Sequence, residues 1–294
     1  MKISKEDVLQ MDRDDPLKVH KEKFHLPNGV IYMDGNSLGA LPKHTVSIIN
    51  NTVTKEWGNG LITSWLGADW VGSPERIGNK IASFIGAEEG EVTVCDSTSV
   101  NLFKVLTSAL QINNKRNVIL SESGNFPTDL YIMDGIKSFS RGAIENRIVD
   151  PLEVLDALNE EVAVLLLTQV HYKTGLIKDM AEITKKAQDV GALVVWDLSH
   201  SAGSIPLNLN DCNVDFAIGC GYKFLNGGPG APAFLFAAKR HHSECHPVLS
   251  GWFGHKEPFA FTDEYSPAMD VRMFLCGTPP VLGLKALEIG VDIF

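Results

Sequence analysis

Short apolar runs alternate with amphipathic segments along most of the chain. Five such runs lie at residues 117–120, 162–167, 192–197, 215–220 and 231–237. Segments of helical period lie between them, including PLEVLDALNE (151–160) and DMAEITKKAQDVGA (179–192). Continuous apolar runs are typical of strands buried on both faces, and strands that alternate with helices indicate a mostly parallel sheet. We therefore expect an α/β fold with a mostly parallel, mixed sheet flanked by helices.

The beginning of the chain has a different pattern. It is charged at first and then contains the turn-rich stretch YMDGNSLGALP (32–42). Glycine, asparagine and proline in such density favour turns over regular elements. We expect residues 1–45 to form an arm or part of a smaller domain, and residues 46–294 to form the large domain.

Composition and charge exclude several classes of function. Hydrophobic residues make up 44% and charged residues 21% of the 294 positions, as in an ordinary globular protein. The net charge of -10 argues against a nucleic-acid partner, since phosphate backbones are bound by clustered lysine and arginine. No apolar run approaches the roughly 20 residues that span a bilayer, and the first residues are too charged for a secretory signal. These features predict a cytoplasmic protein with no membrane partner.

The cysteines and histidines do not indicate a metal site. Five cysteines are widely spaced and odd in number, which fits reduced thiols better than a disulfide framework. The one metal-like cluster comprises His241, His242, Cys245 and His246. Because it lacks a second ligand pair at zinc-finger spacing, we interpret it as a solvated helix end and expect no metal.

An aspartate and a lysine follow two of the predicted strands. ALVVW ends at Asp197, and DFAIGC is followed by Tyr222 and Lys223. Ligands of open α/β sheets bind beyond the carboxyl ends of the strands, so both side chains are expected in one crevice. An amine and a carboxylate there suit pyridoxal 5′-phosphate (PLP), since the amine can form a Schiff base and the carboxylate can keep the pyridine nitrogen protonated. Taken singly, each residue is more typical of a solvated surface.

A phosphate site is predicted separately. EVTVC reads as a strand, DSTSVN as a hydroxyl-rich turn and NLFKVLTSAL as a helix, which places Thr98 and Ser99 at a helix N-terminus. Exposed backbone N–H groups and the helix dipole favour anions there, although a plain helix cap is the commoner use of these residues. In the same way, Phe126 of NFPTD can be a core residue in a simple turn, and His200 can be structural.

Taken together, the motifs resemble those of the kynureninase family, which belongs to the fold type I, aspartate aminotransferase-like group of PLP enzymes. The resemblance covers nearly all of residues 25–290. It is carried, in chain order, by YMDGNSLGALP, SPERIGNKIASFIGA, DSTSVNLFKVL, NFPTDLY, WDLSHSAGSIPLNL, GCGYKFLNGGPGAPAF, GWFGH and CGTPPVL. The combination of Asp-Leu-x-His with Tyr-Lys-x-Leu-Asn-Gly-Gly-x-Gly is the most specific part.

The resemblance implies roles for individual residues. Lys223 is the catalytic amine and binds PLP covalently, Asp197 pairs with the pyridine nitrogen, and Tyr222 assists both catalysis and phosphate binding. The other implied cofactor contacts are Thr98 and Ser99 at the phosphate, Phe126, Pro127, Thr128 and Asp129 over the ring, and Thr168 and His200 beside it. Trp252 and Thr278 resemble positions that reach the cofactor of a partner subunit, which implies a homodimer. Core packing for Trp252 and a helix cap for Thr278 are the alternatives.

The family reaction is the hydrolysis of L-kynurenine to anthranilate and L-alanine in tryptophan breakdown, with 3-hydroxykynurenine as a possible second substrate. Family members continue for roughly 100 further residues, a plausible small domain that supplies an arginine for the substrate carboxylate. The resemblance therefore implies that a C-terminal small domain is missing here and that turnover is impaired. The alternatives are a PLP-binding homologue without turnover and a lyase or desulfurase of the same fold, which would need a mobile reactive cysteine.

Overall fold

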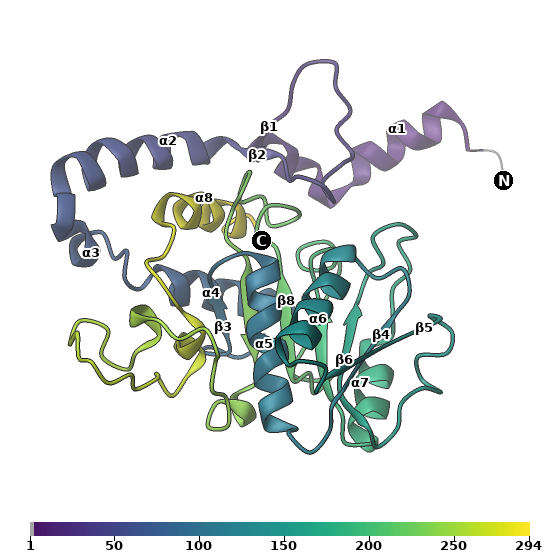
Figure 1. Ribbon diagram of the computed structural model, residues 1–294. Helices are drawn as coiled ribbons and strands as arrows, with labels where there is room; N and C mark the ends of the chain where they lie inside the picture. The colour runs from purple at the N-terminus through teal and green to yellow at the C-terminus, as the bar shows by residue number, and fades with distance from the viewer. Residues whose placement is uncertain (1–2) are drawn as a thin grey trace.

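A seven-stranded sheet forms the centre of the molecule in the computed structural model, which describes residues 3–294 (Figure 1). Across the sheet the order is β3 (Val92–Val94), β9 (Phe234–Ala237), β8 (Phe216–Gly219), β7 (Leu193–Asp197), β6 (Val162–Thr168), β4 (Val118–Glu122) and β5 (Glu145–Val149). The strands from β8 to β5 are parallel, while β9 runs antiparallel to both of its neighbours. The predicted mostly parallel, mixed sheet is confirmed.

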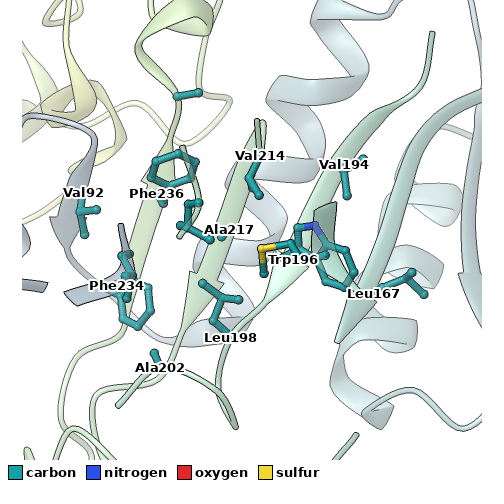
Figure 2. Packing of buried hydrophobic residues seen from close by; sticks show 14 of the residues in the cluster. Val92, Leu167, Val194, Trp196, Leu198, Ala202, Val214, Ala217, Phe234 and Phe236 are labelled. Atoms are coloured by element: carbon teal, nitrogen blue, oxygen red, sulfur yellow. The ribbon is translucent and has the colours of Figure 1, made fainter. Parts of the chain in front are cut away.

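Helices cover both faces of this sheet. On one face lie α5 (Thr98–Ile112) and α6 (Pro127–Phe139), and on the other lie α4 (Ser73–Ile85), α7 (Met180–Asp189) and α8 (Val281–Val291). Successive residues of a strand point to opposite faces, so in β7 the side chain of Val195 packs with α5 while Val194 and Trp196 pack on the other side. Figure 2 shows Trp196 among the buried residues on the face covered by α4, α7 and α8. The central strands are therefore buried on both faces, as their continuous apolar sequences predict.

One expected helix is absent, and one strand of the seven-stranded sheet was not expected. Residues 151–157 form turns in place of the helix predicted for PLEVLDALNE. In this segment Val154, Ala157 and Leu158 pack against the core, whereas Leu152 is 91% exposed. A segment this short gains little from helix propensity alone, so its contacts with the core decide its conformation, and here turns make them. The edge strand β5 has a polar sequence, ENRIV, and so lacked the apolar signal of the others.

The first part of the chain lies along one end of the sheet. It comprises α1 (Lys5–Asp14), a 3₁₀ helix (Pro16–Lys23), the two-residue strands β1 (Phe24–His25) and β2 (Leu41–Pro42), α2 (Lys43–Asn51), a π-helix (Thr52–Gly60), a 3₁₀ turn (Leu61–Thr63) and α3 (Ser64–Gly67). No residue of α1 is buried, whereas α2 packs along α8 (Figure 1). The division into residues 1–45 and 46–294 stays a prediction.

Three short 3₁₀ helices complete the structure, at Lys239–His241, Trp252–Gly254 and Val271–Phe274. Within residues 3–294, every helix is too short or too polar to cross a membrane.

Candidate active site

Asp197 and Lys223 line one cavity of about 680 Å³ at the carboxyl ends of the parallel strands. Asp197 is the last residue of β7, and Lys223 follows β8 closely in sequence. The predicted site residues that line this cavity are Thr98, Ser99, Phe126, Thr128, Asp129, Asp197, His200, Tyr222, Lys223 and Thr278. The fold thus brings together residues from five separate motifs, because the ends of β7 and β8 and the starts of α5 and α6 meet there.

Three predicted site residues lie outside this lining. Pro127 is the first residue of α6, where its fixed φ suits a helix start. Thr168 is buried behind the cavity, and its hydroxyl donates to Asn125 Oδ1 at 2.5 Å. Trp252 packs edge-on against Trp65, with their ring centroids 6.4 Å apart. Their cofactor roles stay predictions.

The amine of Lys223 lies beside a neutral histidine. Lys223 is 6% exposed, and its Nζ is 2.8 Å from His200 Nε2. Burial, together with the nearby charge of Lys223, lowers the pKa of His200 to about 4. The imidazole is therefore neutral at pH 7, and its Nε2 accepts from the Lys223 ammonium while its Nδ1 carries the hydrogen. That buried Nδ1 has no hydrogen-bond partner among the described residues.

Two buried carboxylates, Asp129 and Asp197, also line the cavity. Asp197 is 2% exposed, and its Oδ1 accepts a hydrogen bond from the backbone N–H of Ser199 at 2.7 Å. Burial raises the pKa of Asp197, and burial together with the charge of Asp197 raises the pKa of Asp129. The charge of Lys223 acts in the opposite direction on both groups. A second cation beside these carboxylates would stabilise their ionised forms, which suits a protonated pyridine nitrogen.

The N-terminus of α5 also lines the cavity. The N-cap is Ser97, whose hydroxyl accepts from the N–H of Val100 at 3.4 Å. Thr98 and Ser99 are the next two residues, and they line the cavity. Because Ser97 already fills the capping role, the alternative of a plain cap does not account for Thr98 and Ser99. Their hydroxyls and the positive end of the helix dipole are suited to an anion.

Several residues around the cavity were not anticipated. Asn125 is buried, and its Oδ1 accepts both from Thr168 Oγ1 and from the N–H of Phe126, the latter at 2.7 Å. Tyr172 stacks on His200 and meets the Phe126 ring edge-on, with centroid distances of 6.3 and 5.3 Å. Asn125 belongs to the NFPTD motif and could have been found there. Tyr172 lies in a loop after β6 and gave no signal.

The histidine cluster near residue 241 is bonded to protein groups. His241 Nε2 lies 2.8 Å from Asp215 Oδ1, and His242 Nε2 lies 2.9 Å from the carbonyl oxygen of Ala237. Among residues 3–294, no group of three or more potential ligands is arranged to hold a metal ion.

Comparisons with known proteins agree with this geometry. The family model of aminotransferase class-V matches residues 31–294. A kynureninase of Burkholderia pseudomallei strain K96243 is 47% identical over 99% of this chain and 71% of its own length. A kynureninase of Pseudomonas fluorescens is 45% identical with the same coverage.

Solved structures that resemble the chain share its fold at low identity. A mutant of the C-DES enzyme, with glycine covalently linked to its PLP cofactor, has a TM-score of 0.80 and 18% identity and covers 92% of this chain and 73% of its own. A cysteine desulfurase from Thermococcus onnurineus NA1 has a TM-score of 0.72 and 22% identity and covers 99% of this chain and 70% of its own. These identities support a shared fold only, whereas the similarity to the bacterial kynureninases is far greater. The chain belongs to the kynureninase family of aminotransferase class-V proteins.

Proposed function

We propose that this protein is a PLP-dependent hydrolase that cleaves L-kynurenine to anthranilate and L-alanine. The observation that carries the proposal is the identity of 45–47% to kynureninases over 99% of the chain. The cavity supports it, because Lys223 and Asp197 line it together with the hydroxyl-bearing start of α5.

The residues around the cavity fit PLP. Lys223 would hold the cofactor aldehyde covalently, Asp197 would pair with the pyridine nitrogen, and Thr98 and Ser99 would bind the phosphate. The Phe126 ring, whose centroid is 5.6 Å from Lys223 Nζ, would cover one face of the cofactor ring. A cavity of about 680 Å³ has the size of ordinary cofactor sites. When bound, PLP supplies a ring that accepts electrons from the bond being broken.

Three side chains of the protein, Lys223, His200 and Asp197, would have separate roles in the reaction. Once free of the cofactor, Lys223 Nζ can take a proton from the substrate and return it, because a displaced amine is a base of suitable reach. Neutral His200 accepts a hydrogen bond from that amine and so fixes its direction. Asp197 is buried and accepts from Ser199, so its carboxylate is held in one orientation. Preorganised charges of this kind are the main source of transition-state stabilisation in enzymes.

A desulfurase of the same fold is the alternative, and the cysteines argue against it. The residues that line the cavity, all within the described part of the chain, include no cysteine. Cys220 lies nearest in sequence to Lys223, but burial raises its pKa. Burial also raises the pKa of Cys95 to about 12. Neutral thiols are poor nucleophiles, so none of these groups suits sulfur transfer.

The test is an assay of the purified chain with PLP, in which anthranilate is followed by fluorescence and L-alanine is quantified. Equal amounts of both products from kynurenine, lost in Lys223→Ala, would support the proposal. L-Cysteine serves as the competing substrate. Sulfide or alanine from cysteine, with no anthranilate from kynurenine, would refute it in favour of a desulfurase. The same assay with 3-hydroxykynurenine decides which substrate is preferred.

We further propose that the functional unit is a homodimer. Trp252 packs with Trp65 and stacks on Phe261, with 6.1 Å between the latter two centroids. Next to this aromatic group, Leu66 is 79% and Phe261 74% exposed. A second copy would cover these apolar side chains, and a twofold dimer is the commonest assembly of soluble enzymes. This arrangement is also what the predicted role of Trp252 requires, whereas Thr278 lines the cavity of its own chain.

We also infer a reducing compartment such as the cytoplasm. All five cysteines are free thiols, and Cys95, Cys220 and Cys245 are buried. Free thiols persist where glutathione and thioredoxin keep them reduced. Cell fractionation tests this inference directly.

A further inference from the structure

Lys104 is a fully buried lysine behind the predicted phosphate site. It lies in α5, on the same side of the helix as Asn101, and its side chain is 0% exposed. Lysine is among the residues least often buried completely, and it is buried only when its charge is matched. The partners of this ammonium therefore indicate what it does.

The ammonium of Lys104 bonds two segments that flank the cavity. Its Nζ lies 2.5 Å from Asp96 Oδ2 and 2.5 Å from the carbonyl oxygen of Phe274. The sulfur of Cys95 is 3.9 Å away, but burial raises the pKa of this thiol to about 12, so it is neutral. Burial also raises the pKa of the nearby Cys276. The negative charge that matches Lys104 is therefore that of Asp96.

Asp96 is an anion at a place that is suited to binding anions. It lines the cavity immediately before Ser97 and Thr98, and its side chain is 32% exposed. Its φ of 48° lies in the left-handed region, which aspartate and asparagine tolerate better than most residues. Without a counter-charge, this carboxylate would repel a phosphate bound at Thr98 and Ser99. Lys104 provides that counter-charge from inside the protein.

The hydrogen bond from Lys104 to the carbonyl oxygen of Phe274 also ties α5 to the segment that leads to Thr278. Phe274 ends a 3₁₀ helix, and the chain continues from there to Thr278 at the cavity. Two backbone bonds to Ala233, each 2.9 Å long, hold the other side of the turn: Cys95 N–H donates to Ala233 O, and Ala233 N–H donates to Asp96 O. The phosphate turn is thus held by β-sheet pairing on one side and by Lys104 on the other.

We propose that Lys104 is a positioning residue for the phosphate of PLP: it neutralises Asp96 and fixes the turn that presents Thr98 and Ser99. The inference rests on the proposed function, since it takes this turn to be the phosphate site. Lys104 touches neither substrate nor cofactor and acts through Asp96. A role limited to packing would give no preference for ligands that carry phosphate, and this difference makes the proposal testable.

The experiment compares PLP with pyridoxal, which lacks the phosphate, by fluorescence titration of the cofactor-free full chain. Lys104→Met keeps the volume and removes the charge. We expect it to weaken PLP binding by about tenfold, the effect of one poorly screened charge several ångströms away, and to leave pyridoxal binding nearly unchanged. In Lys104→Met/Asp96→Asn both charges are gone, so most of the PLP affinity should return. Equal loss for both ligands, or a double variant that binds PLP no better than Lys104→Met, would overturn the proposal.

Asp96→Asn alone keeps the proposal testable if Lys104→Met does not fold. Asparagine suits the left-handed conformation. Because the charge of Lys104 is then uncompensated, the Asp96→Asn variant should bind PLP at least as tightly as the unaltered chain does. Weaker PLP binding with unchanged pyridoxal binding would contradict the role given to Lys104. The unaltered chain is the control for the proposed function: if it binds PLP and pyridoxal equally, the phosphate assignment itself fails. If it prefers PLP and Lys104→Met keeps that preference, only the inference on Lys104 fails.

Discussion

Asp197→Asn should make the cofactor-free protein more stable and the enzyme much slower. Asp197 is 2% exposed, and burial raises its pKa, so its ionised form is unfavourable in the folded state. Asparagine has nearly the same shape and can keep the bond from Ser199 N–H. Removing a charge that burial disfavours should stabilise the folded protein by the free energy of that pKa shift, on the order of 1–3 kcal/mol. For a chain of this size that corresponds to a rise in melting temperature of roughly 2–5 °C.

The sign of the pH dependence follows from the raised pKa. Below the ordinary carboxyl pKa of about 4, Asp197 is protonated in both the folded and the unfolded state and contributes no penalty. As the pH rises from there to the raised pKa, the unfolded state loses this proton before the folded state does, so the folded state becomes less stable. The stability advantage of Asp197→Asn should therefore be small near pH 4 and grow to a plateau at higher pH.

The assay is thermal unfolding of the cofactor-free protein at a series of pH values from about 4 upward, the ordinary carboxyl pKa being the lower bound. Asp156→Asn, which makes the same chemical change at an exposed position, is the matched control and should leave the melting temperature unchanged. With PLP bound, Asp197→Asn should lose on the order of a thousandfold in turnover, because the ring nitrogen loses its charged partner. A variant that is less stable at every pH, or one with near-normal turnover, would refute the reasoning.

Three further predictions follow from the same structure. Borohydride reduction of the PLP-bound protein should label one peptide, the one containing Lys223, and Lys223→Ala should bind no reducible cofactor; a label elsewhere would contradict the assignment. Light scattering should show a dimer, and Leu66→Lys should dissociate it, whereas a native monomer that binds PLP at full strength would rule out shared sites. Lys178→Met should destabilise the protein by about 3–5 kcal/mol in urea unfolding, because it leaves the buried carboxylate of Glu122 without its cation 2.6 Å away. Lys185→Met is the control, because it removes a lysine from an exposed ion pair. It should lower the free energy of unfolding by less than about 1 kcal/mol.

Much of the fold could be predicted because burial controls the sequence of the central strands. β6, β7 and β8 have apolar residues on both faces, so their apolar runs locate them directly. The placement of Asp197 and Lys223 follows from the same pattern, because residues that come after parallel strands gather at one edge of the sheet. The edge strand β5 was not predicted because its sequence is polar and only partly buried, and residues 151–157 form turns despite their helical period.

The residues of the site that were not predicted are placed there by contacts between segments far apart in the chain. Lys104 and Phe274 are 170 positions apart, and nothing in the helical pattern of α5 distinguishes a buried lysine from a solvated one. Tyr172 similarly reaches His200 from a loop whose course the sequence does not determine. Residues at strand ends can thus be found from local pattern, whereas residues that orient them require the folded structure.

The charges around the cavity are divided in a way that would orient the cofactor. Asp129 and Asp197 both interact with the ammonium of Lys223, so their surroundings favour a further cation. At the start of α5, Lys104 neutralises Asp96, and the helix N-terminus favours an anion. PLP has a protonatable nitrogen at one side of its ring and a phosphate at the other. The reversed orientation would place phosphate against two buried carboxylates, so the charge distribution alone favours one direction of binding.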